Sequence, residues 1–123
     1  MYNVIVADDE KNIREGIVEL IEWEKLGCKV CASMQNGAQV LKYLEEEKIH
    51  VDIIITDIKM PIMDGMELIG MLNERFPDIK VIILTAYSDF TYAQQAIKFQ
   101  VSDFVVKNDF FLELPRAVKK IIE

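Results

Sequence analysis

Six polar or charged residues follow short apolar runs of the sequence, where the strands of a sheet would end. These residues are Asp8, Asp9, Glu10, Asp57, Thr85 and Lys107. Carboxylates that lie close together repel one another unless a cation lies among them. Oxygen ligands with no His or Cys among them favour Mg²⁺, with Mn²⁺ as a substitute. The set therefore indicates a divalent-cation site.

These residue types could also carry out phosphoryl transfer. A carboxylate such as Asp57 can attack phosphorus and form an aspartyl phosphate. The cation and Lys107 would then neutralise charge on the phosphoryl oxygens, and the Thr85 hydroxyl could donate a hydrogen bond to one of them. Taken singly, each residue has an ordinary structural explanation, because an Asp after a strand is usually a turn or cap residue. The hypothesis depends on the strand ends meeting.

The apolar runs have the character of buried strands. They are continuous and rich in β-branched residues, which is typical of strands covered on both faces of a parallel sheet. They span residues 4–7, 28–32, 53–56, 81–85 and 104–106.

Between these runs, apolar residues recur at helical spacing. The helical stretches span residues 13–21, 38–44, 68–76, 90–97 and 114–122. Five strands alternating with five helices predict an α/β fold, a doubly wound five-stranded parallel sheet with helices on both faces. In such sheets the site lies outside the carboxyl ends of the strands, so the six residues should converge there.

Composition limits the function further. The chain has 123 residues, enough for one domain, and a net charge of −7. That charge argues against direct nucleic-acid binding, which needs a basic surface. No apolar run approaches the roughly 20 residues that cross a bilayer, and no signal peptide is visible. We expect a cytoplasmic protein with no membrane contact.

Cys28 and Cys31 have the spacing of redox and zinc sites, but they lie in a run predicted to be a strand. Residues three apart on a strand point to opposite faces, about 10 Å apart, which is too far for a disulfide. A structural role is therefore expected for both.

The motifs at the strand ends resemble those of response-regulator receiver domains, the CheY-like family, over essentially the whole chain. Residues 7–10 (ADDE) resemble its acidic pair, and residues 56–65 (TDIKMPIMDG) resemble its phosphorylation segment. Residues 84–86 (LTA) and Lys107 resemble its remaining signatures. The resemblance implies a flavodoxin-like sheet with strand order 2-1-3-4-5.

The resemblance also implies a role for each site residue. Asp57 would accept a phosphoryl group from a sensor histidine kinase. Asp9, Asp57 and the main-chain carbonyl of Lys59 would bind Mg²⁺ directly, and Asp8 would bind it through water. The chain would then be a phosphoacceptor that assists its own phosphorylation and dephosphorylation, and not a turnover enzyme.

Phosphorylation in this family draws the threonine, here Thr85, toward the phosphate. An aromatic residue, here Phe104, then turns inward and changes the face formed by the fourth helix, fifth strand and fifth helix, which is also the family's usual dimer surface. Lys59 and Tyr87 occupy positions from which family side chains reach over the phosphate. Neither is suited to orient an attacking water, so we expect a long-lived phosphoryl group.

Residues 21–27 and 87–93 resemble receivers that precede AraC-type DNA-binding domains. We therefore expect residues 1–123 to be the receiver domain of a transcription regulator whose output domain lies outside this sequence. Its partners would be a membrane sensor histidine kinase and that C-terminal domain, with a homodimer possible on phosphorylation. Trp23 is expected to be a surface anchor between the first helix and the second strand.

The sequence departs from the family at two positions. Asn108 replaces the proline that usually follows the lysine, and we predict a trans Lys107–Asn108 bond because a cis bond there would cost about 2.5–4 kcal/mol. Gln100 replaces a glycine, and it would be strained in a left-handed cap conformation. Pro115 belongs in a first helical turn, which predicts that the last helix begins near residues 111–113.

Three other interpretations remain open. One is a receiver-shaped interaction module that no longer switches. Another is a haloacid-dehalogenase-like phosphohydrolase, which also forms an aspartyl phosphate with Mg²⁺ but needs a second acid where Lys59 stands. A flavin-binding flavodoxin-like domain would need a phosphate-binding first loop, and the acids of residues 8–10 would repel a phosphate.

Overall fold

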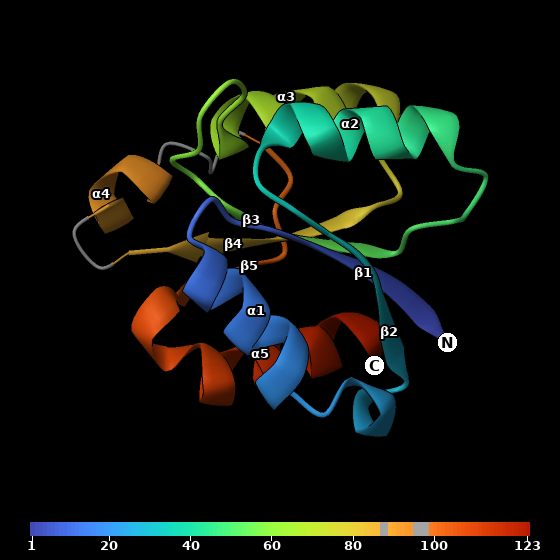
Figure 1. Ribbon diagram of the computed structural model, residues 1–123, viewed down its shortest axis with the longest axis vertical. Coiled ribbons are helices and arrows are strands. Elements are labelled where there is room, and N and C mark those ends of the chain that lie inside the picture. Colours follow the sequence, from blue (N-terminus) through green and yellow to red (C-terminus); the bar gives the residue numbers. More distant parts are fainter. Residues whose placement is uncertain (87–88, 95–98) are drawn as a thin grey trace.

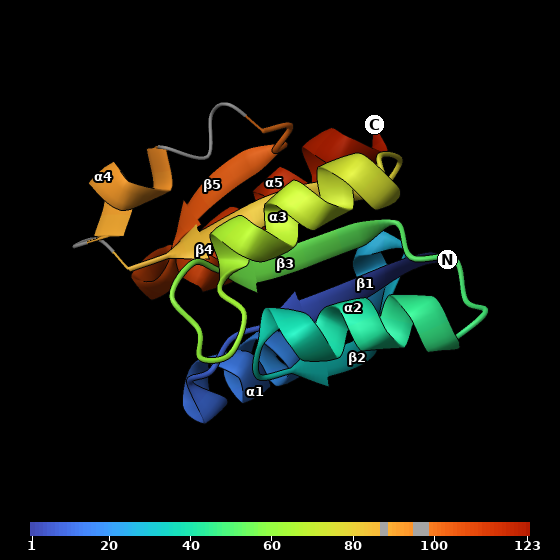
Figure 2. The same ribbon diagram turned by 90° about the horizontal axis from the view of Figure 1, so that it is seen from above.

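The computed structural model describes residues 1–86, 89–94 and 99–123. Within these residues, five parallel strands form one sheet in the order β2-β1-β3-β4-β5 (Figure 2). The strands are β1 Tyr2–Ala7, β2 Cys28–Met34, β3 Ile53–Asp57, β4 Lys80–Thr85 and β5 Asp103–Val106. This confirms the predicted fold class and strand order, and each strand matches its predicted bounds to within two residues.

Four longer helices cover the two faces of the sheet (Figure 1). Helices α2 (Gly37–Glu46) and α3 (Gly65–Arg75) lie on one face, and α1 (Lys11–Leu20) and α5 (Phe110–Ile122) lie on the other. Helix α4 is described over Phe90–Ala93, and Ile97 of its predicted stripe lies outside the described residues. No helix in the described ranges is long and apolar enough to cross a membrane.

Two apolar cores result, one on each face of the sheet. Ile5 and Ile54 pack with the residues of α2 and α3, whereas Val4 and Ile55 pack with those of α1 and α5. All four strand residues are fully buried, and burying each side chain contributes roughly 1.5–3 kcal/mol. Burial on both faces explains why the strands read as continuous apolar runs.

Side-chain caps fix where two helices begin beside the carboxyl edge of the sheet. The Asn36 side chain accepts a hydrogen bond from the Gln39 amide at 2.9 Å, at the start of α2. The Asp64 side chain accepts one from the Glu67 amide at 2.9 Å, at the start of α3. Each such cap contributes about 1 kcal/mol, and together they fix the ends of the loops that border this edge.

The connection between α1 and β2 differs from its prediction. Trp23 opens a short 3₁₀ helix, η1 (Trp23–Leu26), and is buried, so the prediction of a surface anchor is wrong. Its indole N–H donates to the Ile17 carbonyl at 3.1 Å, which satisfies its polar atom within the core. Cys28 and Cys31 lie on β2 with free thiols, as predicted.

The start of the last helix also differs from its prediction. Helix α5 begins at Phe110, directly after a 3₁₀ turn, η4 (Lys107–Asp109), rather than within residues 111–113. Pro115 therefore lies in the second turn and removes one backbone hydrogen bond there. Burial of three apolar side chains in the same helix offsets that loss, and these are Leu114, Ala117 and Val118.

The structure tests the predictions made for the two departures from the family, Asn108 and Gln100. No peptide bond within the described residues is cis, so the Lys107–Asn108 bond is trans, as predicted. Gln100 is not in a left-handed conformation, and the expected strain is absent. Its amide donates to Asn73 Oδ1 at 2.6 Å, and Asn73 Nδ2 donates to its carbonyl at 3.3 Å, so helix α3 holds this segment instead.

Gly65, the first residue of α3, lies too close to the end of β3 for any side chain. A Cβ there would lie 2.1 Å from the Asp57 carbonyl oxygen and 2.9 Å from the Ile58 Cα. The Gly65 amide donates to the Ile58 carbonyl at 2.7 Å, which draws the two backbones together. Glycine at this position therefore lets α3 begin against the residue that ends β3.

Gly65→Ala should lower the free energy of unfolding by about 1–3 kcal/mol, because backbone atoms must move to admit the methyl group. Gly70→Ala in the same helix is the matched control. Its Cβ would meet the Phe99 ring at 3.6 Å, an ordinary contact, and it should be neutral or stabilising by up to about 1 kcal/mol. Urea unfolding measures both values, and equal stabilities of the two variants would contradict the close approach.

Candidate functional site

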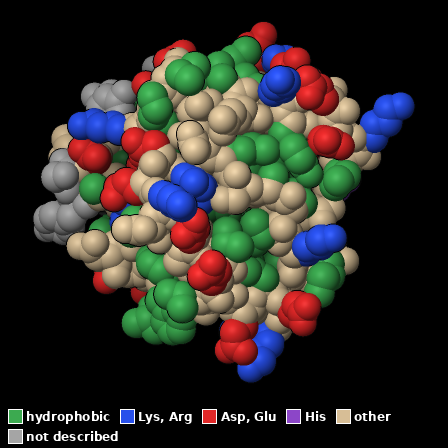
Figure 3. Space-filling view, viewed as in Figure 1, with side chains coloured by type: hydrophobic (Ala, Val, Ile, Leu, Met, Phe, Trp, Pro, Cys, Tyr) green, Lys and Arg blue, Asp and Glu red, His purple; other side chains and the backbone are tan. Residues whose placement is uncertain are grey.

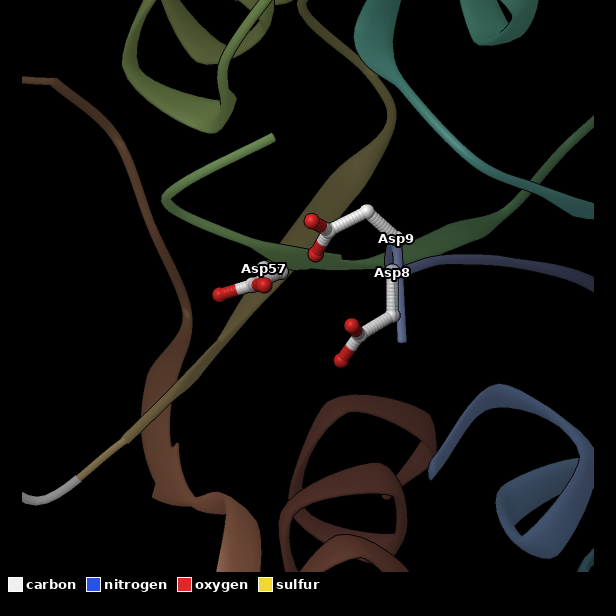
Figure 4. A group of neighbouring side chains, drawn as sticks. All are labelled: Asp8, Asp9 and Asp57. Carbon is white, nitrogen blue, oxygen red and sulfur yellow. The ribbon is translucent and has the colours of Figure 1, made fainter. Parts of the chain in front are cut away.

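Three carboxylates converge at the carboxyl edge of the sheet, as the strand ends predicted. Asp8 and Asp9 follow β1, and Asp57 ends β3. One oxygen from each lies within 4.8 Å of the others. Figure 4 shows the three side chains directed toward a common space.

The pairing of strands β1 and β3 places two of these acids at the same level. Ala7 pairs with Thr56 across the two strands, so Asp8 and Asp57 follow at adjacent positions. Asp8 is fully buried and Asp57 is 4% exposed, whereas Asp9 is exposed. Two of the carboxylates are therefore removed from water, which is costly unless positive charge compensates them.

The ammonium group of Lys107 provides that charge. Lys107 opens η4 after β5, and its side chain is only 7% exposed. Its Nζ lies 2.9 Å from Asp57 Oδ2, 3.1 Å from Asp8 Oδ2 and 2.6 Å from Glu10 Oε1. The lysine is therefore shared by three acids within the described part of the chain.

The electrostatics of the site follow from this crowding. Burial raises the pKa of Asp57 to about 6, although the hydrogen bond from Lys107 opposes the shift. Burial also raises the pKa of Asp8. For Lys107, burial lowers the pKa, but hydrogen bonds to Glu10 and Asp57 outweigh that effect and raise it. The Lys107 ammonium stays charged, and the pKa values of the Asp8 and Asp57 carboxyls lie above their usual range.

Backbone amides satisfy one oxygen of each buried acid. The Ile58 amide donates to Asp57 Oδ1 at 2.7 Å, and the Glu10 amide donates to Asp8 Oδ1 at 2.9 Å. Asp8 Oδ2 is buried and has no hydrogen bond within the described residues, because the Lys107 ammonium, 3.1 Å away, donates instead to Asp8 Oδ1 at 3.2 Å. This oxygen belongs to a carboxylate of the acid cluster, and it could bind a cation or accept a hydrogen bond from water on that cation.

The acid cluster suits a hard divalent cation. Its donors are all carboxylate oxygens, and one of them is buried without a hydrogen bond. This set fits Mg²⁺, which binds oxygen ligands and keeps several waters. Asp8, Asp9 and Asp57 are the side chains that would hold the ion. Lys59 lies in the loop after β3, and its ammonium pairs with Asp89 at 3.0 Å. The metal role expected of its main-chain carbonyl stays a prediction.

The remaining predicted residues lie along the neighbouring strands. Thr85 ends β4, is fully buried, and donates its hydroxyl to the Ala86 carbonyl at 3.1 Å. It pairs with Val106, the residue before Lys107, which places it at the same edge of the sheet. Phe104 on β5 is partly buried against the core beneath α2 and α3. Tyr87 lies outside the described residues.

Two residues of this site were not assigned roles from the sequence. Glu10 makes the shortest contact to Lys107, and Gly65 allows α3 to approach Asp57. Glu10 was visible as a third consecutive acid, but sequence spacing alone could not show that its side chain turns toward the lysine. The close approach at Gly65 depends on how α3 packs against the end of β3, which the local sequence does not reveal.

Comparison with known proteins decides the family. The family model of the response regulator receiver domain matches residues 4–119. The chain belongs to this family. It is 38% identical over 107 residues to the uncharacterized transcriptional regulatory protein YesN of Bacillus subtilis, covering 87% of this chain and 28% of YesN.

Solved receiver structures agree with this assignment. The REC domain of the response regulator AraT from Geobacillus stearothermophilus has 37% identity and a TM-score of 0.86, with 98% of this chain and 95% of that chain covered. TrrA from Thermotoga maritima, solved in complex with Mg²⁺-BeF, has 35% identity and a TM-score of 0.80, with 98% and 99% covered. A LuxR-family DNA-binding regulator is also similar, so the predicted AraC-type output domain is not confirmed.

The raised pKa of Asp57 predicts a pH-dependent stability in protein freed of metal by a chelator. The folded-state pKa is about 6 and the ordinary value is 3.8. The folded state therefore binds the Asp57 proton more tightly than the unfolded state does. Protonation of Asp57 stabilises the fold at low pH, and this stabilisation is lost as the pH rises through about 6. Asp57→Asn stays neutral, so it should be more stable than wild type by roughly 1–3 kcal/mol at pH 8 and by little at pH 4.

Urea unfolding at several pH values measures this difference. Asp78→Asn is the matched control, because Asp78 is exposed and precedes β4 at the opposite edge of the sheet. A stability difference between wild type and Asp57→Asn that stays constant with pH would contradict the raised pKa.

Proposed function

We propose that this receiver domain accepts a phosphoryl group on Asp57 from a sensor histidine kinase in a Mg²⁺-dependent reaction. One observation carries the proposal: the buried Asp57 carboxylate lies 2.9 Å from the Lys107 ammonium and beside two further acids. TrrA, a relative with 35% identity, binds Mg²⁺-BeF. A similar complex of this chain would use the same acid cluster.

The chain's own residues account for most of the transfer. A bond forms between phosphorus and an Asp57 oxygen as the bond from phosphorus to the donor histidine breaks, and the histidine nitrogen leaves with the electron pair. The Lys107 ammonium neutralises charge on the phosphoryl oxygens. Bound Mg²⁺ supplies further positive charge and favours the ionised form of Asp57. In this account the domain is a phosphoacceptor, and it does not turn over substrate.

The switch would begin at Thr85. Its hydroxyl donates to the Ala86 carbonyl at 3.1 Å in the present state, and donating to a phosphoryl oxygen would require breaking that bond. Phe104 would then turn into the space that Thr85 leaves and change the face formed by α4, β5 and α5. Phe104 has no hydroxyl group, so packing alone would hold it in either position.

In the full-length protein this face would control a DNA-binding output domain, by direct contact or through a homodimer. This chain spans only 28% of YesN and 41% of HptR from Staphylococcus aureus, both transcriptional regulatory proteins. An AraC-type output domain remains our proposal. We do not propose direct DNA binding by residues 1–123, because the net charge is −7. The face in Figure 3 also shows acidic and basic side chains interspersed.

Incubation with Mg²⁺ and acetyl phosphate, followed by intact mass measurement, tests the proposal. Wild type and the Asp78→Asn control should each gain one phosphoryl group, and Asp57→Asn should gain none. Addition of a chelator should prevent the gain, because the cation is required for transfer. A full adduct on Asp57→Asn would sink the assignment. Continuous phosphate release would indicate a phosphohydrolase, and no change in mass would indicate an inert interaction module.

The phosphoryl group should also be long-lived. Neither Lys59 nor Tyr87 carries a carboxylate or carboxamide that could orient an attacking water, and we expect Tyr87 to exclude water. Tyr87→Ala and Lys59→Asn should each lose phosphate several-fold faster than wild type, as measured by decay of the intact-mass adduct. Arg116→Gln on the outer face of α5 is the control. Unchanged decay in both variants would rule out shielding by these residues.

A further inference from the structure

The side chain of Glu10 is directed to the site and not to its own helix. Glu10 is the cap residue of α1, but its side chain makes no capping hydrogen bond. Its Oε1 instead lies 2.6 Å from Lys107 Nζ, the shortest contact that the ammonium makes. The Glu10 side chain is 59% exposed, so it approaches the buried lysine from the solvent side.

The three acids around Lys107 are not equivalent. Asp8 and Asp57 belong to the acid cluster that suits a cation, whereas Glu10 does not. Lys107 and a divalent cation therefore compete for the same two carboxylates. A cation bound by Asp8, Asp9 and Asp57 would not displace Glu10 from Lys107.

We propose that Glu10 is a positioning residue that draws the Lys107 ammonium toward solvent and so leaves Asp8 and Asp57 available to Mg²⁺. This inference rests on the proposed function, because it concerns the same site. Without the Glu10 charge, Lys107 would shift fully onto Asp8 and Asp57. The lysine would then act as a competing cation in the metal site.

The first test measures Mg²⁺ affinity by isothermal titration calorimetry. Glu10→Gln keeps an acceptor oxygen but removes the charge, and it should weaken Mg²⁺ binding by about 3–10-fold because a close negative charge is lost and a competitor is gained. Glu15→Gln is the matched control, since Glu15 lies on the same helix and, within the described residues, forms an ion pair with Lys11 alone, at 3.9 Å. It should change the affinity by less than about 2-fold. Wild-type affinity in Glu10→Gln would overturn the inference.

A double-mutant cycle shows whether Glu10 acts through Lys107. In a Lys107→Met background no lysine competes with the metal, so Glu10→Gln should weaken Mg²⁺ binding by less than about 2-fold, from the lost charge alone. An equal loss of affinity in both backgrounds would mean that Glu10 acts only by its own charge and would overturn the positioning role.

Phosphorylation by acetyl phosphate separates this inference from the proposed function. Glu10→Gln should need several-fold more Mg²⁺ than wild type for half-maximal rate, because the displaced lysine competes with the cation for Asp8 and Asp57. A lower saturated rate with an unchanged Mg²⁺ requirement would overturn the inference. If wild type forms no adduct, the proposed function fails, and the calorimetric comparison still decides the role of Glu10.

Discussion

The buried ammonium of Lys107 is shared by Asp8, Asp57 and Glu10 at 2.6–3.1 Å, and the other features of the site depend on this sharing. Two of the acids are almost completely removed from water, and an unpaired charge at such depth is strongly destabilising. The lysine makes their burial tolerable without satisfying every oxygen, since Asp8 Oδ2 has no hydrogen bond to any described residue. The site is therefore suited to accept further positive charge, and in the proposed function Lys107 would exchange partners when a phosphoryl group arrives.

The fold produces this arrangement by bringing strand ends together. Strands β1 and β3 pair directly, which sets Asp8 beside Asp57. The turn η4 then carries Lys107 back to the same edge through a trans bond to Asn108. This helical turn directs the lysine inward without the proline that usually follows it in the family. On the other side, Gly65 lets α3 start against Asp57.

Much of the fold could be predicted from the sequence, because strands buried on both faces leave continuous β-branched runs. The acids and Lys107 stood at the ends of those runs, so their convergence followed from the sheet topology. Other features depend on packing that periodicity does not encode. Trp23 packs into the apolar core, and its indole N–H can be buried there because it donates to the Ile17 carbonyl. Helix α5 begins early because η4 leads directly into it.

Side-chain partners were the least predictable part of the site. Gln100 avoids a left-handed conformation because Asn73, distant in sequence, bonds both its amide and its carbonyl. Glu10 was expected to be one more acid at a strand end, and its contact with Lys107 depends on how η4 returns the lysine. Both contacts join residues 27 or more positions apart, which no local pattern specifies.

A crystal structure with Mg²⁺ and beryllofluoride, a mimic of the phosphoryl group, would show whether Asp57 is the phosphoacceptor. We predict a metal ion bound by the acid cluster and beryllofluoride attached to an Asp57 oxygen. Lys107 Nζ should lie within hydrogen-bond distance of a fluorine and Thr85 Oγ1 should turn away from the Ala86 carbonyl. Beryllofluoride on another residue, or none at Asp57 with the metal bound, would contradict the assignment of Asp57 as the phosphoacceptor.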